Sequence, residues 1–454
     1  MLARIRVVTD KTHMNLSPIL LALPLLAAAA LQQPDPVAAV SEAELRASVE
    51  RLARFGTRHT LSSQTDRTRG IGAARRWAET RLRAISRDCR NCLTIETPEK
   101  TISGNRVPAP TRLVNVLAIQ RGSARPDEIV VIQGHIDSIA SDVMDATSDA
   151  PGANDNASGT AAVIEAARVL SRHRFPVTIV YAVLSGEEQG LYGATALAEH
   201  ARAKGWRVKA VLNNDIVGGS RGADGRIDDA SVRVFSEGPR GDATPELTAR
   251  QRRLGGENDS PSRNLSRFVD VLADRVKVGL DVRQIWRTDR FGRGGDHLPW
   301  LQAGVPAIRF TVGIEDWNHQ HQNVRSEGGI VYGDTPDLVD YAYLARVTRL
   351  NVAALAQLAR SPAPPAPTAE GGLAPDTTLK WDPVPGAARY IVRWRETDAA
   401  NWQHAVEVAN PGHVLSGVRV DDWTFGVSAV AADGSESPVA SAVPGGGYAA
   451  SPAR

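Results

Sequence analysis

Short apolar runs of strand length alternate with helical stretches between residues 41 and 360, and this alternation constrains the fold more than any other feature. Several of these runs lead into a short segment that contains a histidine or a carboxylate: 128–134, 177–184, 208–212 and 306–312. Strands that alternate with helices predict a largely parallel sheet covered on both faces. We therefore predict an α/β fold for residues 41–360, with a mostly parallel, mixed sheet sandwiched by helices.

Periodicity and capping signals predict the remaining elements of this region. We expect a further strand over 113–119 and helices over 41–56, 71–85, 158–170, 191–203, 265–278 and 336–358. Ser41 and Ser158 are the expected caps of the first and third helices. Residues 219–265 are rich in Gly, Arg, Asp and Pro, which predicts a partly irregular insertion beside the functional face.

The C-terminal part of the chain has a different pattern. Residues 361–375 begin with a Pro-rich run and are expected to form an extended linker. Residues 376–447 contain alternating strand-like runs with turn residues between them, which predicts a small all-β sandwich. The pattern resembles a fibronectin type III module, with Trp381 in the core and Trp423 where a Tyr is expected. This module carries no ionisable cluster, so we expect it to pack or to attach to a surface or a partner.

The N-terminus predicts export. Residues 1–30 contain basic residues followed by the apolar stretch Leu16–Ala30, with small residues at Ala28 and Ala30 that suit signal peptidase. The stretch is shorter than the roughly 20 residues of a membrane-spanning helix, so a stable span is not expected. A cleaved signal peptide places the mature protein in the periplasm or outside the cell.

Charge and cysteine content exclude some functions. The formal net charge is +2, with 53 basic and 51 acidic residues, which gives no support for nucleic-acid binding. The two cysteines, Cys89 and Cys92, favour a small structural disulfide in an exported protein, with free thiols as the alternative.

Histidine and carboxylate side chains follow the predicted strands in a consistent order. His135, Glu188, Asp215 and a late histidine follow strand runs, and Asp155 lies in a Gly-rich loop before a helix. Ligands gather at the carboxyl ends of strands in open α/β sheets. Each residue alone has an ordinary structural explanation, such as a hydrogen bond or a solvated loop. The ordered set instead predicts a two-metal hydrolytic site, with Asp155 able to bridge both ions.

Two further carboxylates have predicted supporting roles. Asp137, two residues after His135, is placed to accept the other imidazole N–H. Glu187 and Glu188 are adjacent and point in different directions, so one can bind metal while the other moves a proton between water and the leaving amine.

The motifs 134–138, 152–159, 186–193 and 214–218 resemble, in order, those of the co-catalytic zinc aminopeptidases related to bacterial leucyl aminopeptidase and glutamate carboxypeptidase II. The resemblance covers about residues 41–360. It implies that two Zn2+ ions are held by His135, Asp155, Glu188, Asp215 and a late His, with Asp155 bridging and Glu187 as general base. It also implies a supporting role for Asp296. Co2+ or Mn2+ would suit the same ligands.

The sequence departs from that family at the last ligand, where His-Thr followed by Asp is usual. Here the segment contains His319 and His321, and we favour His321. Glu315 or Asp316 could hold a substrate amine, although a solvated loop is the expected alternative. Arg287, Arg290 and Arg293 could bind a substrate carboxylate, although surface salt bridges are the alternative.

The predicted function is an exported zinc aminopeptidase that acts on peptides. A carboxypeptidase or aminoacylase of the related two-zinc family is one alternative, but the expected Asp-x-Lys-Gly is replaced by 155–159. A glutaminyl cyclase is a second alternative. A non-catalytic binding protein on the same fold is the alternative from a different class.

Overall fold

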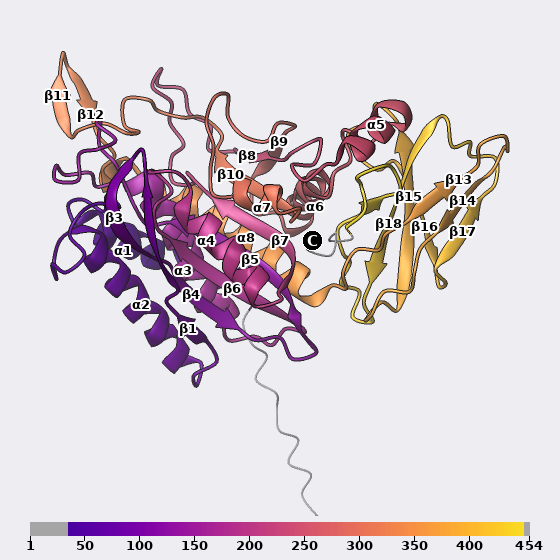
Figure 1. The fold of residues 1–454 in the computed structure, drawn as a ribbon, viewed down its shortest axis with the longest axis horizontal. Helices are drawn as coiled ribbons and strands as arrows, with labels where there is room; N and C mark the ends of the chain where they lie inside the picture. Colours follow the sequence, from indigo (N-terminus) through magenta and orange to yellow (C-terminus); the bar gives the residue numbers. More distant parts are fainter. Residues whose placement is uncertain (1–34, 449–454) are drawn as a thin grey trace, which may run out of the picture. The chain divides into compact units, whose positions relative to one another are not determined.

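An eight-stranded mixed sheet forms the centre of residues 41–360 in the computed structural model, which describes residues 35–448 (Figure 1). The strands, in sheet order, are β1 (Thr94–Glu96), β4 (Val116–Gln120), β6 (Val177–Leu184), β5 (Arg125–His135), β7 (Arg207–Asn214), β10 (Ala307–Val312), β8 (Ser231–Phe235) and β9 (Asp281–Ile285). The neighbouring pairs β5–β6, β5–β7, β7–β10 and β8–β9 are parallel, and the pairs β1–β4, β4–β6 and β8–β10 are antiparallel. The predicted α/β class with a mostly parallel sheet is confirmed.

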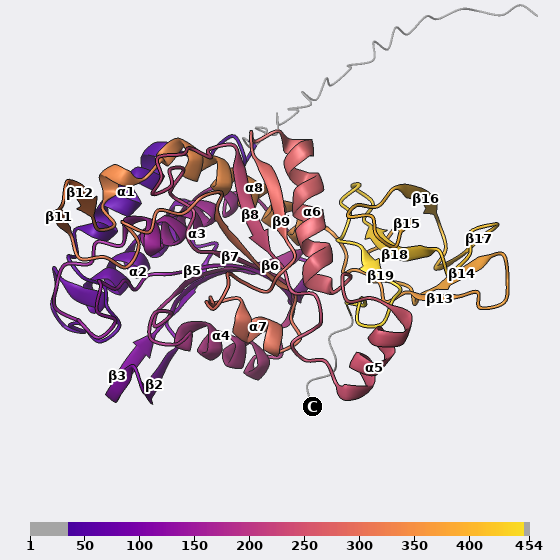
Figure 2. The same cartoon turned by 90° about the horizontal axis from the view of Figure 1, so that it is seen from above.

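Helices cover both faces of this sheet (Figure 2). One face carries α1 (Glu42–Ala53), α2 (Gly70–Asp88), α3 (Gly159–Leu170), α6 (Pro261–Val276) and α8 (Tyr341–Arg360), and the other carries α4 (Tyr192–Ala203) and α7 (Leu298–Gln302). Successive residues of the central strand β5 serve the two layers: Val130 and Ile132 pack in the larger core, and Ile129 and Val131 pack in the smaller one. This follows from the alternation of side chains along a strand.

The first residues of α1 and α3 show which of the predicted N-terminal caps form. Ser41 caps α1, since its hydroxyl accepts from the Glu44 N–H at 3.3 Å, as predicted. The predicted cap at Ser158 is wrong. Its hydroxyl donates to the Asn154 carbonyl at 2.6 Å, and the Gly159 N–H donates instead to the Asn156 side chain at 2.9 Å. Asn156 takes the capping role because Ser158 already has helical backbone angles.

The segment predicted as an insertion is partly built into the sheet. Residues 219–265 supply β8, which pairs with both β9 and β10, and the helix α5 (Pro245–Leu254). Two hairpins lie outside the main sheet, β2 (Glu99–Gly104) with β3 (Val107–Val114) and β11 (Arg325–Glu327) with β12 (Ile330–Tyr332).

Two small antiparallel sheets follow α8. One contains β13 (Thr368–Glu370), β14 (Thr377–Lys380) and β17 (Gly412–Leu415), and the other contains β16 (His404–Val408), β15 (Arg389–Glu396), β18 (Trp423–Val430) and β19 (Ala440–Ser441). Trp381 is buried and meets Tyr390 edge to face at 5.3 Å between ring centres. β13 lies within the expected linker 361–375, so that segment is not wholly extended linker. The likeness to a fibronectin type III module stays a prediction.

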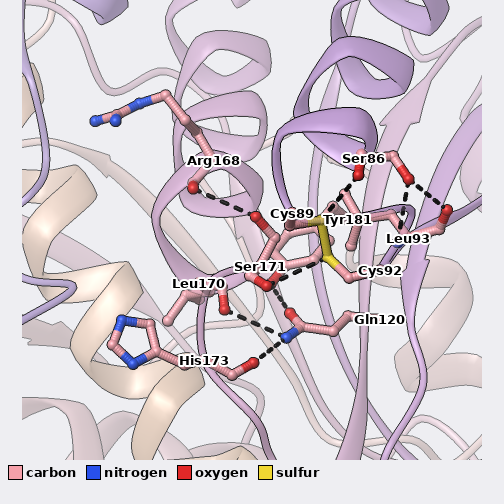
Figure 3. Close-up of a disulfide and its surroundings, with 10 residues drawn as sticks. All are labelled: Ser86, Cys89, Cys92, Leu93, Gln120, Arg168, Leu170, Ser171, His173 and Tyr181. Carbon is pink, nitrogen blue, oxygen red and sulfur yellow. Dashed lines mark hydrogen bonds between the residues drawn. A yellow bond between two sulfur atoms is a disulfide. The ribbon is translucent and has the colours of Figure 1, made fainter. Parts of the chain in front are cut away.

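The two cysteines form the predicted disulfide just after α2 (Figure 3). Cys89 and Cys92 close a short turn in which the Ser86 hydroxyl both donates to the Leu93 carbonyl and accepts from the Leu93 N–H. The bridge therefore fixes the exit of α2 toward β1.

The predicted signal peptide, residues 1–30, lies outside the described residues. Within residues 35–448, no helix is long and apolar enough to cross a bilayer.

Candidate metal centre

The five predicted ligands converge at one edge of the main sheet. His135 is the last residue of β5, Glu188 lies in the loop after β6, and Asp215 directly follows β7. Asp155 lies in the short helical turn 153–158 that leads into α3, and His321 lies in the loop after β10. Because β5, β6, β7 and β10 run parallel, their carboxyl ends share this edge.

A glycine allows the Asp155 loop to approach β7. A Cβ atom at Gly159 would lie 2.1 Å from the Asn214 carbonyl oxygen, which no larger residue tolerates. The Asn156 side chain also donates to that carbonyl at 2.8 Å. The loop is thereby held against the end of β7, next to Asp215.

The first group of potential ligands comprises His135, Asp155 and Asp215. The His135 Nε2 atom lies 3.3 Å from Asp155 Oδ1 and 3.8 Å from Asp215 Oδ2. One ligand atom from each of the three residues lies within 4.8 Å of the others, and all three residues are buried.

The second group comprises Asp155, Glu188 and His321. The His321 Nε2 atom lies 3.0 Å from Asp155 Oδ2 and 3.3 Å from Glu188 Oε1. Asp155 belongs to both groups and turns a different carboxylate oxygen toward the histidine of each. His319 faces elsewhere, with its Nδ1 atom 3.2 Å from Asp316 Oδ2.

The buried carboxylates fit a cation better than they fit one another. Asp155 Oδ1 and Glu188 Oε1 are buried and accept no hydrogen bond from the described part of the chain. Burial lowers the pKa of His135, but Glu187 and three surrounding aspartates raise it well above its ordinary value. Acidic oxygens and imidazole nitrogens at this spacing form the donor set that zinc prefers.

Glu187 lies beside the two groups and, like their members, lines an open cleft at this edge of the sheet. It can form a third group with His135 and Glu188, whose ligand atoms fall within the same 4.8 Å limit. Burial raises the pKa of Glu187 well above its ordinary value, and the nearby carboxylate of Glu188 adds to this effect. The two adjacent glutamates thus both reach the site, and of the two it is Glu188 that contacts His321.

Asp137 supports the site differently from the prediction. The His135 Nδ1 atom lies 3.1 Å from the Asp137 backbone carbonyl and 3.6 Å from its carboxylate. The carboxylate instead accepts from the Thr60 hydroxyl and from the Glu188 N–H, both at 3.1 Å. Asp137 therefore orients the imidazole mainly through its main chain and fixes the Glu188 loop with its side chain.

Asp296 is completely buried, and its carboxylate oxygens accept no hydrogen bond within residues 35–448. Burial raises its pKa to about 8, which the nearby Asp137 and Asp215 reinforce. Its main-chain carbonyl accepts from the Gln133 side chain at 2.8 Å.

Three residues at the site were not anticipated from the sequence. Arg309 is fully buried in β10, and its Nη2 atom lies 2.9 Å from Asp215 Oδ1. Asp334 accepts from the Asp155 N–H at 2.6 Å, and Gln320 donates to Asp155 Oδ2 at 2.8 Å. Of these three, only Arg309 could have been noticed in the sequence, because it is a charged residue inside an otherwise apolar strand.

The candidate substrate-binding residues have mixed outcomes. The expectation that Glu315 lies on a solvated loop is wrong, since its side chain is 3% exposed and contacts Arg233 at 2.5 Å and Arg293 at 2.8 Å. Its carboxylate is thereby engaged by arginines. Arg290 and Arg293 line the same cleft of about 490 Å³ as the two groups of potential ligands, whereas Arg287 is exposed and is not part of its lining.

Comparisons with known proteins show which chains this one resembles. Over 412 residues the chain is 43% identical to a "probable zinc metalloprotease" of Leptosphaeria maculans, which covers 89% of this chain and 95% of that protein. A protein of the same description from Pyricularia oryzae is 40% identical over 92% of this chain and 84% of its own length.

Solved structures share the fold at low sequence identity. LapB from Legionella pneumophila aligns with a TM-score of 0.53 and 20% identity, over 71% of this chain and 74% of that chain. The LapA aminopeptidase of Legionella pneumophila aligns with a TM-score of 0.51 and 18% identity, over 71% and 73%. Residues 115–342, which contain nearly all of the site, match the model of peptidase family M28. This chain belongs to peptidase family M28.

Proposed function

We propose that this protein is an exported aminopeptidase that binds two zinc ions and removes N-terminal residues from peptides. One observation carries the proposal: Asp155 is shared between two groups of potential ligands, one with His135 and Asp215 and the other with Glu188 and His321. A shared carboxylate between two such groups is typical of two-metal hydrolases.

Each ion would have three protein ligands, with Asp155 common to both. Zinc supplies Lewis acidity, which polarises the scissile carbonyl and makes water a better nucleophile. The residues around it set the geometry. Asp137 orients His135 through its carbonyl, and Asp334 and Gln320 hold Asp155 through its N–H and its Oδ2 atom.

Glu187 is the proposed general base. Its carboxylate lines the cleft and lies close to the potential ligands His135 and Glu188. From there it can take a proton from the attacking water and deliver it to the leaving amine. Burial and the neighbouring carboxylates disfavour the charged form of Glu187 and raise its pKa, and cations bound beside it would lower that pKa.

Exopeptidase activity is supported by the motif 152–159 and by the aminopeptidase named among the solved neighbours, which share the fold. Export is supported by the sequence of residues 1–30. A carboxypeptidase is the second candidate, because Arg290 and Arg293 line the cleft and guanidinium groups bind carboxylates well.

Hydrolysis of matched substrates tests the proposal. We would compare aminoacyl-p-nitroanilides with a free α-amine, the same compounds with an acetylated amine, and N-blocked peptides with a free C-terminus. Turnover that requires the free amine establishes the aminopeptidase. Hydrolysis of only the N-blocked peptides with a free C-terminus would refute the aminopeptidase and support the carboxypeptidase.

A further inference from the structure

The cleft that contains the proposed metal ligands is lined by both carboxylates and arginines. Its carboxylates, within residues 35–448, are the four that the proposed mechanism already uses: Asp155, Glu187, Glu188 and Asp215. Its other charged side chains are all arginines, namely Arg106, Arg290 and Arg293. The mechanism gives none of these three cations a task.

Arg290 is nearly buried and incompletely bonded. Its side chain is 9% exposed, and its Nη1 atom is buried and makes no hydrogen bond to any residue of 35–448. That atom lies 3.5 Å from Glu315, beyond good hydrogen-bond distance for a charged pair. The Nη1 donor therefore has only this long ion pair, and because an unsatisfied buried donor is costly, a further acceptor in the cleft would stabilise it.

Arg293 lies close to the reacting centre. Its Nη1 atom lies 3.4 Å from the Gln320 side-chain oxygen, and the Gln320 amide donates to Asp155 Oδ2 at 2.8 Å. Its guanidinium also lies 4.8 Å from the ring centre of Trp317, which holds the arginine in place. Arg293 is therefore two hydrogen bonds from the shared carboxylate.

The carboxylates that contact these two arginines also contact other arginines. Glu315 is contacted by Arg233, Arg290 and Arg293, so one carboxylate serves three guanidinium groups. Asp289 is likewise shared between Arg290 and Arg309. The guanidinium groups of Arg290 and Arg293, which line the cleft, therefore share their carboxylate partners with other arginines.

We propose that Arg290 and Arg293 form a subsite for a carboxylate of the substrate, placed next to the scissile bond. The inference rests on the proposed peptidase function and specifies its substrate class: short peptides with a free C-terminal carboxylate, or peptides with an acidic side chain beside the cleaved bond. Guanidinium groups bind either carboxylate in the same planar, bidentate manner. Arg106, on the opposite hairpin turn, donates to the Glu188 carbonyl at 3.0 Å and contributes mainly long-range attraction.

Matched substrate pairs test the subsite and separate the two sources of carboxylate. The first pair is Leu-Gly and Leu-Gly amide, and the second is the p-nitroanilides of Glu and Gln. We expect kcat/KM to be about tenfold or more higher for the charged member of one pair, as one or two charge-assisted hydrogen bonds provide. Preference within the first pair identifies the C-terminal carboxylate, and preference within the second identifies the acidic side chain.

Variants assign the preference to the two arginines. In Arg290→Met and Arg293→Met, the ratio of charged to neutral kcat/KM should fall toward one, mainly through a higher KM for the charged substrate. Arg293→Lys should keep part of the ratio, because it keeps the charge but loses the planar fork. Arg287→Met is the matched control, since Arg287 belongs to the same loop but is exposed and outside the cleft, and its ratio should equal that of the wild type.

Binding provides a readout that does not depend on turnover. Calorimetric titration of the zinc-loaded Glu187→Gln variant should give tighter binding of the charged member of the preferred pair, and adding Arg290→Met should abolish the difference. Equal affinity and equal kcat/KM within both pairs would overturn the subsite, whereas turnover of neutral free-amine substrates would leave the proposed function standing. Absence of all hydrolysis, with the affinity difference retained, would refute the proposed function and keep the subsite.

Discussion

At the scale of single residues, the site depends on which atom of each acidic side chain faces which neighbour. Asp155 turns Oδ1 toward His135 and Oδ2 toward His321, so one side chain serves both groups. The residue types and their order along the chain were sufficient to nominate Asp155 and its neighbours. They were not sufficient to show the supporting contacts of Asp334 and Gln320, which come from loops far away in sequence.

The adjacent glutamates provide a matched pair of variants. Glu187→Gln should lower kcat by about 10²- to 10⁴-fold, the usual contribution of a general base, while the zinc content stays at the wild-type value. Glu188→Gln should lower the zinc content as well, because it weakens a ligand of the second group. Steady-state kinetics and metal analysis of both proteins check this, and loss of zinc from Glu187→Gln alone would reverse the two roles.

The two late histidines provide a second pair. His321→Ala should release zinc from the second group and lower the zinc content by about half, since a protein ligand lost from an open site costs much of its affinity. His319→Ala should keep all of its zinc, because His319 contacts Asp316 and not the shared carboxylate. Metal analysis after dialysis decides between them, and the opposite pattern would move the ligand to His319.

At the scale of elements, the strands and helices were predictable because their periodicity is local. The end of each parallel strand also predicted where polar side chains would gather. The capping of α3 was not predictable, because Asn156 and Ser158 are both good capping residues and the choice depends on how the loop lies against β7. The membership of β8 in the main sheet depends on pairing with β9 and β10, which are distant in sequence.

Lys209 in β7 gives a pH prediction at this scale. Its side chain is buried against the Ser361 carbonyl, to which Nζ donates at 2.8 Å, and burial lowers its pKa to about 7. The unfolded chain keeps the ordinary lysine pKa near 10.4, so between these values the unfolded chain binds more protons than the folded chain. The free energy of unfolding should therefore gain up to about 1.4 kcal/mol per pH unit from Lys209 between roughly pH 7 and pH 10.

Lys209→Met removes the titrating group and keeps most of the apolar stem. Urea denaturation at several values between pH 7 and pH 9.5 should give a smaller rise in stability for this variant than for the wild type. Parallel curves for the two proteins would show that Lys209 stays charged in the folded chain.

At the scale of the whole molecule, the C-terminal sheets are tied to the peptidase region by a buried ion pair. Both carboxylate oxygens of Asp259, just before α6, lie 2.7 Å from Arg395 Nη2 in β15. The side chains are 5% and 1% exposed. Composition and periodicity could predict two folded regions, but not this contact, because neither residue belongs to a recognisable motif.

Breaking this pair should destabilise the chain. Arg395→Met leaves the Asp259 carboxylate buried with fewer partners, which typically costs about 3–5 kcal/mol of unfolding free energy. Arg389→Met is the matched control in the same strand, since its pair with Glu407 is largely exposed and should be worth at most about 1 kcal/mol. Equal effects in chemical denaturation would show that the buried pair does not join the two regions.

The most direct test of the account is the zinc content of the purified full-length protein, measured by mass spectrometry of the metal, beside that of Asp155→Asn. The account predicts about two zinc ions per chain in the wild type, as a shared bridging carboxylate requires, and loss of both in the variant. One zinc ion per chain that persists in Asp155→Asn would contradict the two-metal centre.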